Sequence, residues 1–236
     1  MTEEGKLSYT GTISQILSLV GFSPKMIVRS GETDPKILEK VGKTLGVRWS
    51  PDTDLLEYDF PVNMSKRQGA AKLGPDWTPA DLDTISKFVF TRRSALVLTA
   101  QVYDPLGMVT AFTIQLKLAM KQLIIMEGMA WDTPLPDQLQ AQWRALAKDM
   151  VLAKPVKFPR SIKPLNAKNR LELVGFWDGS SVAFSGVVYV RWLDESDQWH
   201  VHVLCSKARV TPKAGLTIPR AELSGLVVLV LSLIHI

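Results

Sequence analysis

Four stretches near the end of the chain decide its fold: V-G-F-W-D-G-S-S (174–181), S-G-V-V-Y-V-R-W (185–192), V-L-C-S-K-A-R-V-T-P (203–212) and T-I-P-R-A-E-L (217–223). The first three are rich in β-branched and aromatic residues and predict strands, whereas the last predicts the start of a helix. Asp178 ends the first predicted strand and Glu222 opens the helix. Three strands followed by a helix predict the opening half of a mixed α/β domain.

We expect these strands over residues 171–178, 182–192 and 199–206 and the helix from about residue 220. Between the last strand and the helix, residues 207–219 predict a loop whose charges are all basic. Apolar residues at helical spacing predict the buried face of the helix, formed by Leu223, Leu226, Val227 and Val230.

The composition is that of an ordinary globular protein, with 46% hydrophobic and 22% charged residues in 236. The net charge of +5 is compatible with a polyanionic partner, although many basic proteins bind no nucleic acid. The first residues lack a secretory signal, and residues 225–236 are too short an apolar run to cross a bilayer. We therefore expect an intracellular protein, cytoplasmic or nuclear, without a membrane partner.

Few residues offer soft metal ligands. Cys205 is the only cysteine, which excludes an internal disulfide and a thiolate zinc site. His200 and His202 fall on one face of a predicted strand, but no third ligand is evident beside them. We interpret the two histidines as surface residues of the strand.

The first third of the chain predicts a mixture of short elements. Apolar spacing indicates a helix over residues 12–20, a strand over 25–29 and a short helix from Asp34. The segments 46–49 and 55–60 predict a β-hairpin, and residues 61–79 predict a loop rich in Pro, Gly and Lys.

The middle of the chain predicts an all-helical unit followed by a basic connector. Helical spacing runs from Thr78 to Val102, then over about 108–127, and again around residues 139–150. Residues 154–170 hold six basic residues, three prolines and no acid. Two interpretations remain open for this segment: a solvated linker, or a strip along which a nucleic-acid backbone runs.

The two carboxylates each have an ordinary structural explanation. Asp178 can be a turn residue before Gly179, and Glu222 can be an acid favoured by the helix macrodipole. Their shared frame is more informative, because an acid at a strand end, an antiparallel hairpin, basic residues and an acid at a helix start occur together.

That frame resembles the ribonuclease H segment of BEL/Pao-type retrotransposon polyproteins. The motifs G-F-W-D-G-S, V-V-Y-V-R, L-C-S-K-A-R-V-T-P and L-T-I-P-R-A-E-L carry the resemblance, and G-V-R-W-S-P-D-T-D, Y-D-P-L-G and W-D-T-P-L-P extend it upstream. It covers roughly residues 10–230. It implies an α/β (α+β) chain divided into the end of a reverse transcriptase palm (1–77), a helical thumb or connection unit (78–153), a basic linker (154–170) and the N-terminal half of a ribonuclease H-like domain (171–230).

The resemblance also implies a chemistry. Ribonuclease H enzymes use four acids to hold two Mg²⁺ ions, which activate a water and stabilise the leaving oxygen as the RNA strand of an RNA–DNA hybrid is cut. Asp178 would be the first acid and Glu222 the second. Lys207, Arg209 and Arg220 would face phosphates, although Arg209 and Arg220 can equally be structural residues. The partners implied are an RNA–DNA hybrid or other nucleic acid and the remaining polyprotein domains.

Several features depart from the family pattern. A small or polar residue usually precedes the aspartate, where Trp177 stands, and alanine is common after it, where Gly179 stands. The Y-x-D-D polymerase motif is expected before residue 1, and the other two acids are expected beyond the helix. Residues 231–236 resemble a translated sequencing-library adapter, so we interpret this tail, His235 included, as non-native.

Three function classes follow from these features. The first is a retrotransposon polyprotein fragment of reverse transcription, with ribonuclease chemistry in the intact parent and none in this chain alone. The alternative is a non-catalytic nucleic-acid-binding or scaffold remnant. The third class, an aspartic peptidase, is disfavoured, because Asp178-Gly179-Ser180 has the residues of the Asp-Thr/Ser-Gly motif in the wrong order and no other candidate motif is present.

Overall fold

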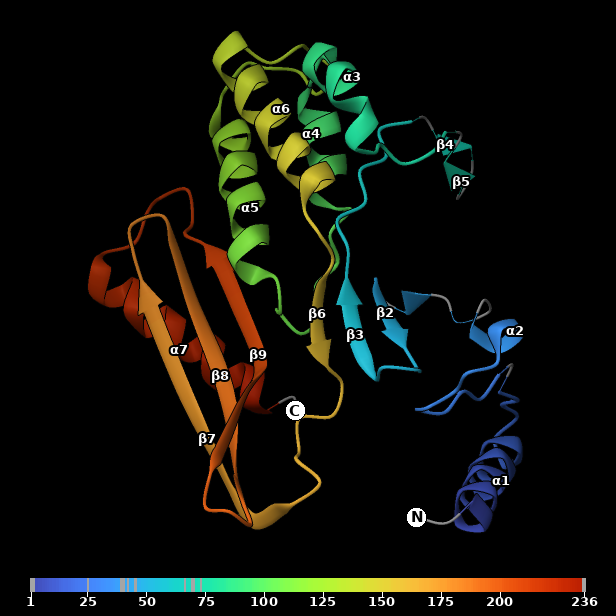
Figure 1. Ribbon diagram of the computed structural model, residues 1–236. Helices are drawn as coiled ribbons and strands as arrows, with labels where there is room; N and C mark the ends of the chain where they lie inside the picture. Colours follow the sequence, from blue (N-terminus) through green and yellow to red (C-terminus); the bar gives the residue numbers. More distant parts are fainter. Residues whose placement is uncertain are drawn as a thin grey trace.

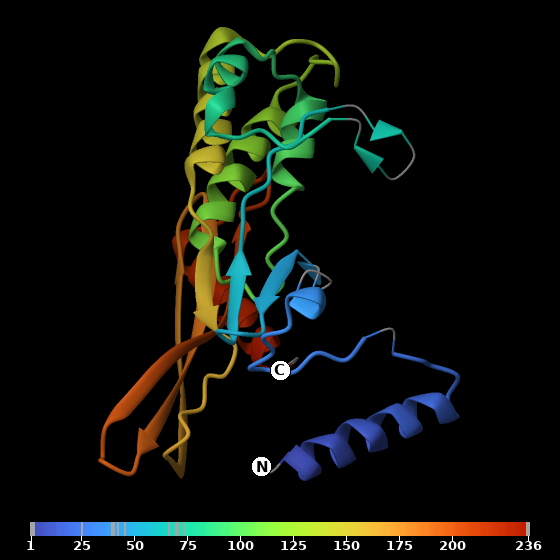
Figure 2. The ribbon, with the colours of Figure 1, turned by 45° about the vertical axis from the view of Figure 1, so that its right-hand side comes forward.

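The computed structural model describes residues 3–24, 26–38, 41, 43–44, 46–65, 67–68, 71–72 and 74–234. The chain begins with helix α1 (Glu3–Leu19) and the short helix α2 (Pro35–Leu38). Figures 1 and 2 show α1 set apart from the other elements, joined to them through an extended segment. The strand predicted over residues 25–29 is wrong for its described part, because residues 26–29 pair with no other strand. Met26 and Ile27 are exposed there instead of packing in a sheet.

A small antiparallel sheet follows, in the order β1-β2-β3-β6. Its strands are β1 (Lys43–Thr44), β2 (Val47–Ser50), β3 (Leu55–Tyr58) and β6 (Val156–Pro159). The hairpin predicted before and after residues 50–54 is therefore confirmed. Two further short strands, β4 (Arg67–Gln68) and β5 (Ala71–Lys72), pair with each other inside the predicted loop 61–79.

The predicted basic linker 154–170 is wrong for the segment that forms β6 and for residues 167–170, which begin strand β7 (Ala167–Gly179). Val156–Pro159 pair with β3, and Arg160 continues this connection through a bidentate ion pair with Asp54. Asp54 also accepts a hydrogen bond from Trp49 Nε1 at 2.9 Å, and the Arg160 guanidinium lowers the pKa of the Asp54 carboxyl. A four-residue strand was hidden from sequence analysis because only a distant partner stabilises it.

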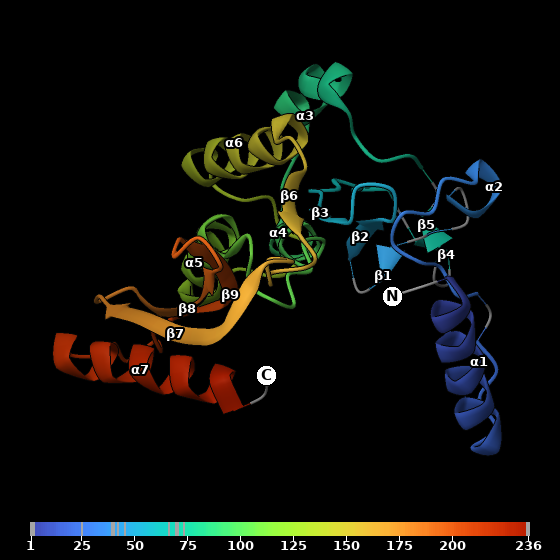
Figure 3. The same cartoon turned by 60° about the horizontal axis from the view of Figure 1, so that its bottom comes forward.

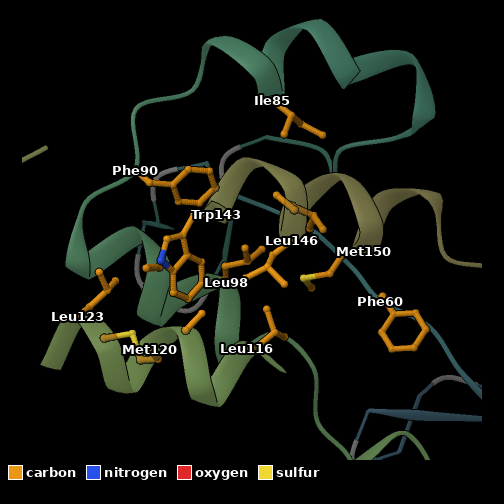
Figure 4. Close-up of a cluster of buried hydrophobic side chains, with 14 of the residues drawn as sticks. Phe60, Ile85, Phe90, Leu98, Leu116, Met120, Leu123, Trp143, Leu146 and Met150 are labelled. Atoms are coloured by element: carbon orange, nitrogen blue, oxygen red, sulfur yellow. The ribbon is translucent and has the colours of Figure 1, made fainter. Parts of the chain in front are cut away.

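The helical unit consists of η1 (Pro79–Asp81), α3 (Leu82–Lys87), α4 (Arg92–Thr99), α5 (Thr110–Ile125) and α6 (Asp137–Leu152). The expected helix from Thr78 to Val102 is broken, because Thr91 caps a new helix and its hydroxyl accepts from Ser94 N–H. The core of this unit lies between α3, α4, α5 and α6, where Trp143, Phe90, Leu98 and Leu123 are buried (Figure 4).

The final section is a three-stranded antiparallel sheet covered by a helix. The strands β7 (Ala167–Gly179), β8 (Ala183–Asp194) and β9 (Trp199–Val210) pair in the order β7-β8-β9, and α7 spans Ile218–Ile234. Figure 3 shows α7 on one side of this sheet and α5 on the other. The mixed α/β fold expected from the sequence is confirmed. His235 and Ile236 lie outside the described residues.

Strand β9 is longer than expected, which corrects the predicted basic loop. Lys207 and Arg209 lie in β9 and pair with Gly186 and Phe184 of β8. The residues interpreted as a loop therefore belong to the rigid sheet as far as Val210.

The buried face of α7 also differs from the prediction. Leu223, Val227 and Val230 are exposed, whereas Ala221, Val228 and Leu229 are buried. The reason is a close approach between helix and sheet: a methyl group at Gly225 would lie 2.9 Å from the carbonyl oxygens of both Asp178 and Ser185, neighbours on β7 and β8. Only small residues fit at such a contact. The spacing of large apolar residues therefore predicted the wrong face of α7 as the buried one.

Candidate functional site

The tip of β7 carries the first candidate carboxylate. Asp178 is exposed, and its Oδ1 accepts a hydrogen bond from Gly179 N–H at 2.7 Å. The chain then turns, with Ser180 N–H donating to the carbonyl of Ala183 at 2.8 Å and the Ser180 hydroxyl donating to the same oxygen at 2.9 Å. Asp178 is therefore held on a strand end whose turn is fixed by hydrogen bonds.

The second carboxylate reaches the same place because α7 packs directly on this strand end. A methyl group at Gly179 would overlap the backbone of Ala221 and Glu222, with the Ala221 carbonyl oxygen 2.6 Å away. Gly179 follows Asp178 in the chain, so the backbones that carry Asp178 and Glu222 are neighbours. The sequence placed the two acids more than 40 residues apart, and the fold brings their elements into contact.

The side chains leave their elements in different directions. The notional methyl groups of Gly175 and Gly179 both point at α7, and side chains alternate between the two faces of a strand. Asp178 therefore projects from the face opposite α7, whereas Glu222 is an exposed residue of the helix. The fold therefore brings the two acid-bearing elements together, whereas the two carboxylates leave these elements on different sides of the end of β7.

Carboxylate oxygens are the ligands that Mg²⁺ prefers, so the chemistry of Asp178 and Glu222 fits this ion. Within the described ranges, however, no group of three or more His, Cys, Asp or Glu side chains is placed to hold a metal. The described residues thus provide two donors for such a site and no third.

One of the two strand histidines, His200, is engaged by a carboxylate across the β8–β9 hairpin. His200 Nε2 lies 2.8 Å from Asp194 Oδ2, across the β8–β9 hairpin. Asp194 also accepts hydrogen bonds from Ser196 and Gln198 N–H, both at 2.9 Å. His200, followed by these backbone donors, lowers the pKa of the Asp194 carboxyl. The cluster ties His200 to the hairpin turn, and the interpretation of His202 as a surface residue of the strand stays a prediction.

The three predicted phosphate-facing residues are divided between two places. Lys207 and Arg209 are exposed residues of β9 and line the same groove, which has a volume of about 940 Å³. Arg220 is exposed on the first turn of α7, two residues before Glu222, and does not line that groove.

Sequence analysis missed Lys117, an α5 residue that lines the same groove as Lys207 and Arg209. Lys121, one turn later, lines an adjoining pocket of about 290 Å³ together with Lys213. The spacing of Lys117 and Lys121 at i and i+4 could have indicated a basic helix face. The position of that face beside β9 depends on tertiary packing alone.

The comparison with protein families identifies the section that carries this site. A family model described as the Pao retrotransposon-like RNaseH-like domain matches residues 91–236, more than half of the chain. The match begins beside α4, so the family domain includes α4–α6 as well as the sheet β7–β9 and α7. No curated protein matches the chain. Among the described residues, no helix combines the length and apolar character needed to cross a bilayer.

The strand-end aspartate, the helix packed upon it and the family match over these same elements agree: this chain belongs to the family of Pao retrotransposon-like RNaseH-like domains.

Proposed function

We propose that this chain is a segment of a retrotransposon polyprotein that acts in reverse transcription, and that Asp178 and Glu222 belong to a site that cleaves the RNA strand of RNA–DNA hybrids. The contact between Gly179 and the backbone of Ala221 and Glu222 carries this proposal, because it joins the two acid-bearing elements. Asp178 and Glu222 would hold the Mg²⁺ ion, which would supply activation of a water and stabilisation of charge at the leaving oxygen. The hydrogen bond from Gly179 N–H orients the Asp178 carboxylate toward this role.

The upstream elements have proposed roles in the same polyprotein. Residues 1–77 would form the end of a reverse transcriptase palm and residues 78–153 a thumb or connection unit. The resemblance of G-V-R-W-S-P-D-T-D and Y-D-P-L-G to the region between palm and ribonuclease H supports this division.

The ion-binding part of the proposal can be tested with Mn²⁺ as a paramagnetic probe. Added Mn²⁺ should broaden the amide signals of Gly179 and Glu222 before others in the NMR spectrum, because both lie beside the two carboxylates. Asp178→Asn should remove this broadening, whereas Asp83→Asn on α3 should leave it unchanged. Broadening that centres on other residues, or that survives Asp178→Asn, would overturn the proposed site.

The chain alone should show no measurable nuclease activity, because two carboxylates do not complete a two-metal site. The measurement is cleavage of a labelled RNA–DNA hybrid by the purified chain with Mg²⁺. Turnover that Asp178→Asn abolishes would contradict this expectation while supporting the assignment of Asp178.

The alternative function, nucleic-acid binding without cleavage, is favoured by the exposed cations of β9. Binding to nucleic acid that weakens steeply with salt, together with Mn²⁺ broadening that does not depend on Asp178, would select this alternative.

A further inference from the structure

The groove between the helical unit and the sheet β7–β9 is built from four separate segments. One wall comes from the end of α4 and residues 102–107, and it continues along α5. Residues 205–210 of β9 also line the groove, together with Val228, Leu231 and Ser232 of α7. With a volume of about 940 Å³, it is in the range of pockets that take small molecules or a few nucleotides, which is far too small for a double helix.

Three cations line this groove without neutralising partners. Lys117, Lys207 and Arg209 make no ion pair within 4 Å with any residue that the structure describes. The acid that lines the groove, Asp104, is engaged by the start of α5, where its two oxygens accept from Met108 and Val109 N–H at 2.8 and 2.9 Å. Lys117 interacts with Asp104 only at longer range. The groove therefore has an excess of positive charge, which attracts polyanions.

The basic lining continues into the adjoining pocket. Lys121 Nζ donates to Thr211 Oγ1 at 2.8 Å and so bridges α5 to the end of β9, and Lys213 lies 3.3 Å from Glu127. Lys117 lines this pocket as well as the groove, whereas Lys121 and Lys213 are engaged by Thr211 and Glu127.

An aromatic ring and apolar walls accompany these cations. Tyr103 lines the groove and is 53% exposed, and Val102 and Leu106 are its apolar neighbours on the same wall. Unpaired cations beside an exposed aromatic ring are the combination by which proteins hold single-stranded nucleic acid, because the cations contact phosphates and a base stacks on the ring.

We propose that this groove binds a single-stranded nucleic-acid segment, with phosphates at Lys117, Lys207 and Arg209 and a base on Tyr103. Arg209 pairs with Phe184, which pairs with Gly179, so the groove lies across the sheet from the tip of β7. The inference shares Lys207 and Arg209 with the nucleic-acid-binding role proposed above, whereas binding of a single strand does not require Asp178. A duplex is too wide to enter, and the selectivity for single strands follows from the size of the groove.

The test is fluorescence anisotropy with a labelled oligo(dT) strand, measured over a series of salt concentrations. The triple variant Lys117→Gln, Lys207→Gln, Arg209→Gln should bind at least about tenfold more weakly, and the slope of log K against log salt should fall by about 2, since each phosphate contact to a single strand contributes about 0.7. A matched control, Lys36→Gln, Lys87→Gln, Lys154→Gln, removes the same charge from exposed positions outside the groove and should lose much less affinity.

A second variant separates stacking from charge. Tyr103→Ala should weaken binding about tenfold while leaving the salt slope unchanged, because a base contact releases no counterions. Circular dichroism checks that each variant is folded. Equal losses in the groove and control triples, an unaltered affinity of Tyr103→Ala, equal competition by polyglutamate, or equally tight and groove-dependent binding of a duplex would each overturn the proposal. Mn²⁺ broadening at Gly179 should survive in the groove variants, so a failure here is distinguishable from a failure of the proposed nuclease site.

Discussion

Gly179 contributes both to the geometry of the candidate site and to the stability of the domain. Its missing side chain allows the backbone of α7 to lie against the end of β7, beside Asp178. The sequence singled this glycine out as a departure from the alanine that is common after the aspartate. In this structure the departure has a cause, because an alanine methyl would overlap the helix backbone.

We expect Gly179→Ala to destabilise the protein by about 1–3 kcal/mol, since overpacking forces the backbone to shift. Urea unfolding measures the change. Gly11→Ala is the control, because Gly11 has no atom within 4 Å of the added methyl and lies inside α1. Equal stability of the Gly179→Ala protein and the parent would show that α7 does not pack this closely.

The carboxyl group of Asp194 should make the stability of the protein depend on pH. Its carboxyl has a lowered pKa in the folded protein, so it adds stability above the usual pKa of aspartate, and this contribution is lost as the pH falls through the lowered value. Asp194→Asn should therefore destabilise the protein at pH 7, and the difference from the parent should shrink below about pH 4. Urea unfolding at several pH values tests this, with Asp83→Asn on α3 as the exposed control. A difference in unfolding free energy between parent and variant that stays constant across this pH range would show that the Asp194 carboxylate does not stabilise the fold through its charge.

At the scale of elements, Gln140 joins α6 to the segments around it. Its Oε1 accepts from Phe90 N–H at 2.8 Å, and its Nε2 donates to the carbonyls of Phe90 and Leu135 at 2.9 and 3.1 Å. The Gln140 side chain is buried, so it satisfies backbone groups that water cannot reach. This explains how the chain can remain extended between α3 and α4 inside the core.

Gln140→Leu should cost about 1–3 kcal/mol, because the Phe90 N–H is left buried without an acceptor. Gln138→Leu, at an exposed position on the same turn of α6, should change stability by less than about 0.5 kcal/mol. Thermal or urea unfolding of the pair provides the comparison, and similar losses in both would contradict the bridging role of Gln140.

Sequence periodicity predicted the elements whose burial is local. Helices α5 and α6 and the β8–β9 hairpin were expected because their apolar residues repeat at the required spacing. The buried face of α7 was not, since glycine and alanine make the contact there and a hydrophobicity pattern gives such residues little weight. Strand β6 and the extension of β9 through Val210 depend on partners distant in the sequence, which no local pattern records.

The residues of the candidate site likewise divide into those that a local sequence pattern indicates and those that only tertiary packing brings together. Asp178 and Glu222 could be named from motifs, because strand ends and helix starts are local signals. The assembly of Lys117 with Lys207 could not, because α5 meets β9 only in the folded chain.

At the scale of the whole molecule, residues 106–107 join the helical unit to the sheet. Ser206 N–H donates to the Leu106 carbonyl at 2.9 Å, and the Ser206 hydroxyl donates to the carbonyl of Gly107. A side chain at Gly107 would overlap the Ser206 carbonyl. The neighbouring thiol of Cys205 is buried beside Val188 and Leu229, and it also lines the groove next to residues 106–107. Burial raises the pKa of this thiol.

We expect Gly107→Ala to increase the rate at which Cys205 reacts with a thiol reagent, because the substitution separates the loop from β9. Gly128→Ala is a matched control: both glycines have a φ of +74°, but Gly128 has no neighbour within 4 Å of an added methyl. Backbone strain is therefore common to the two variants, and a steric clash occurs in only one. Equal reaction rates in both variants would show that the junction does not protect Cys205.

The same junction makes the two borders of this sheet unequal. At Ser206 the outer border of β9 is already occupied by the chain's own residues 106–107, whereas β7 pairs only with β8 among the described strands. A sheet whose two edge strands are both unpaired can add further chains at each edge and grow into a fibre. When only one edge strand is unpaired, pairing between two copies leaves no edge for a third. We expect association through this sheet to use the β7 border and to favour a pair over longer assemblies, which sedimentation over a range of protein concentrations would reveal as a plateau at twice the mass of the chain.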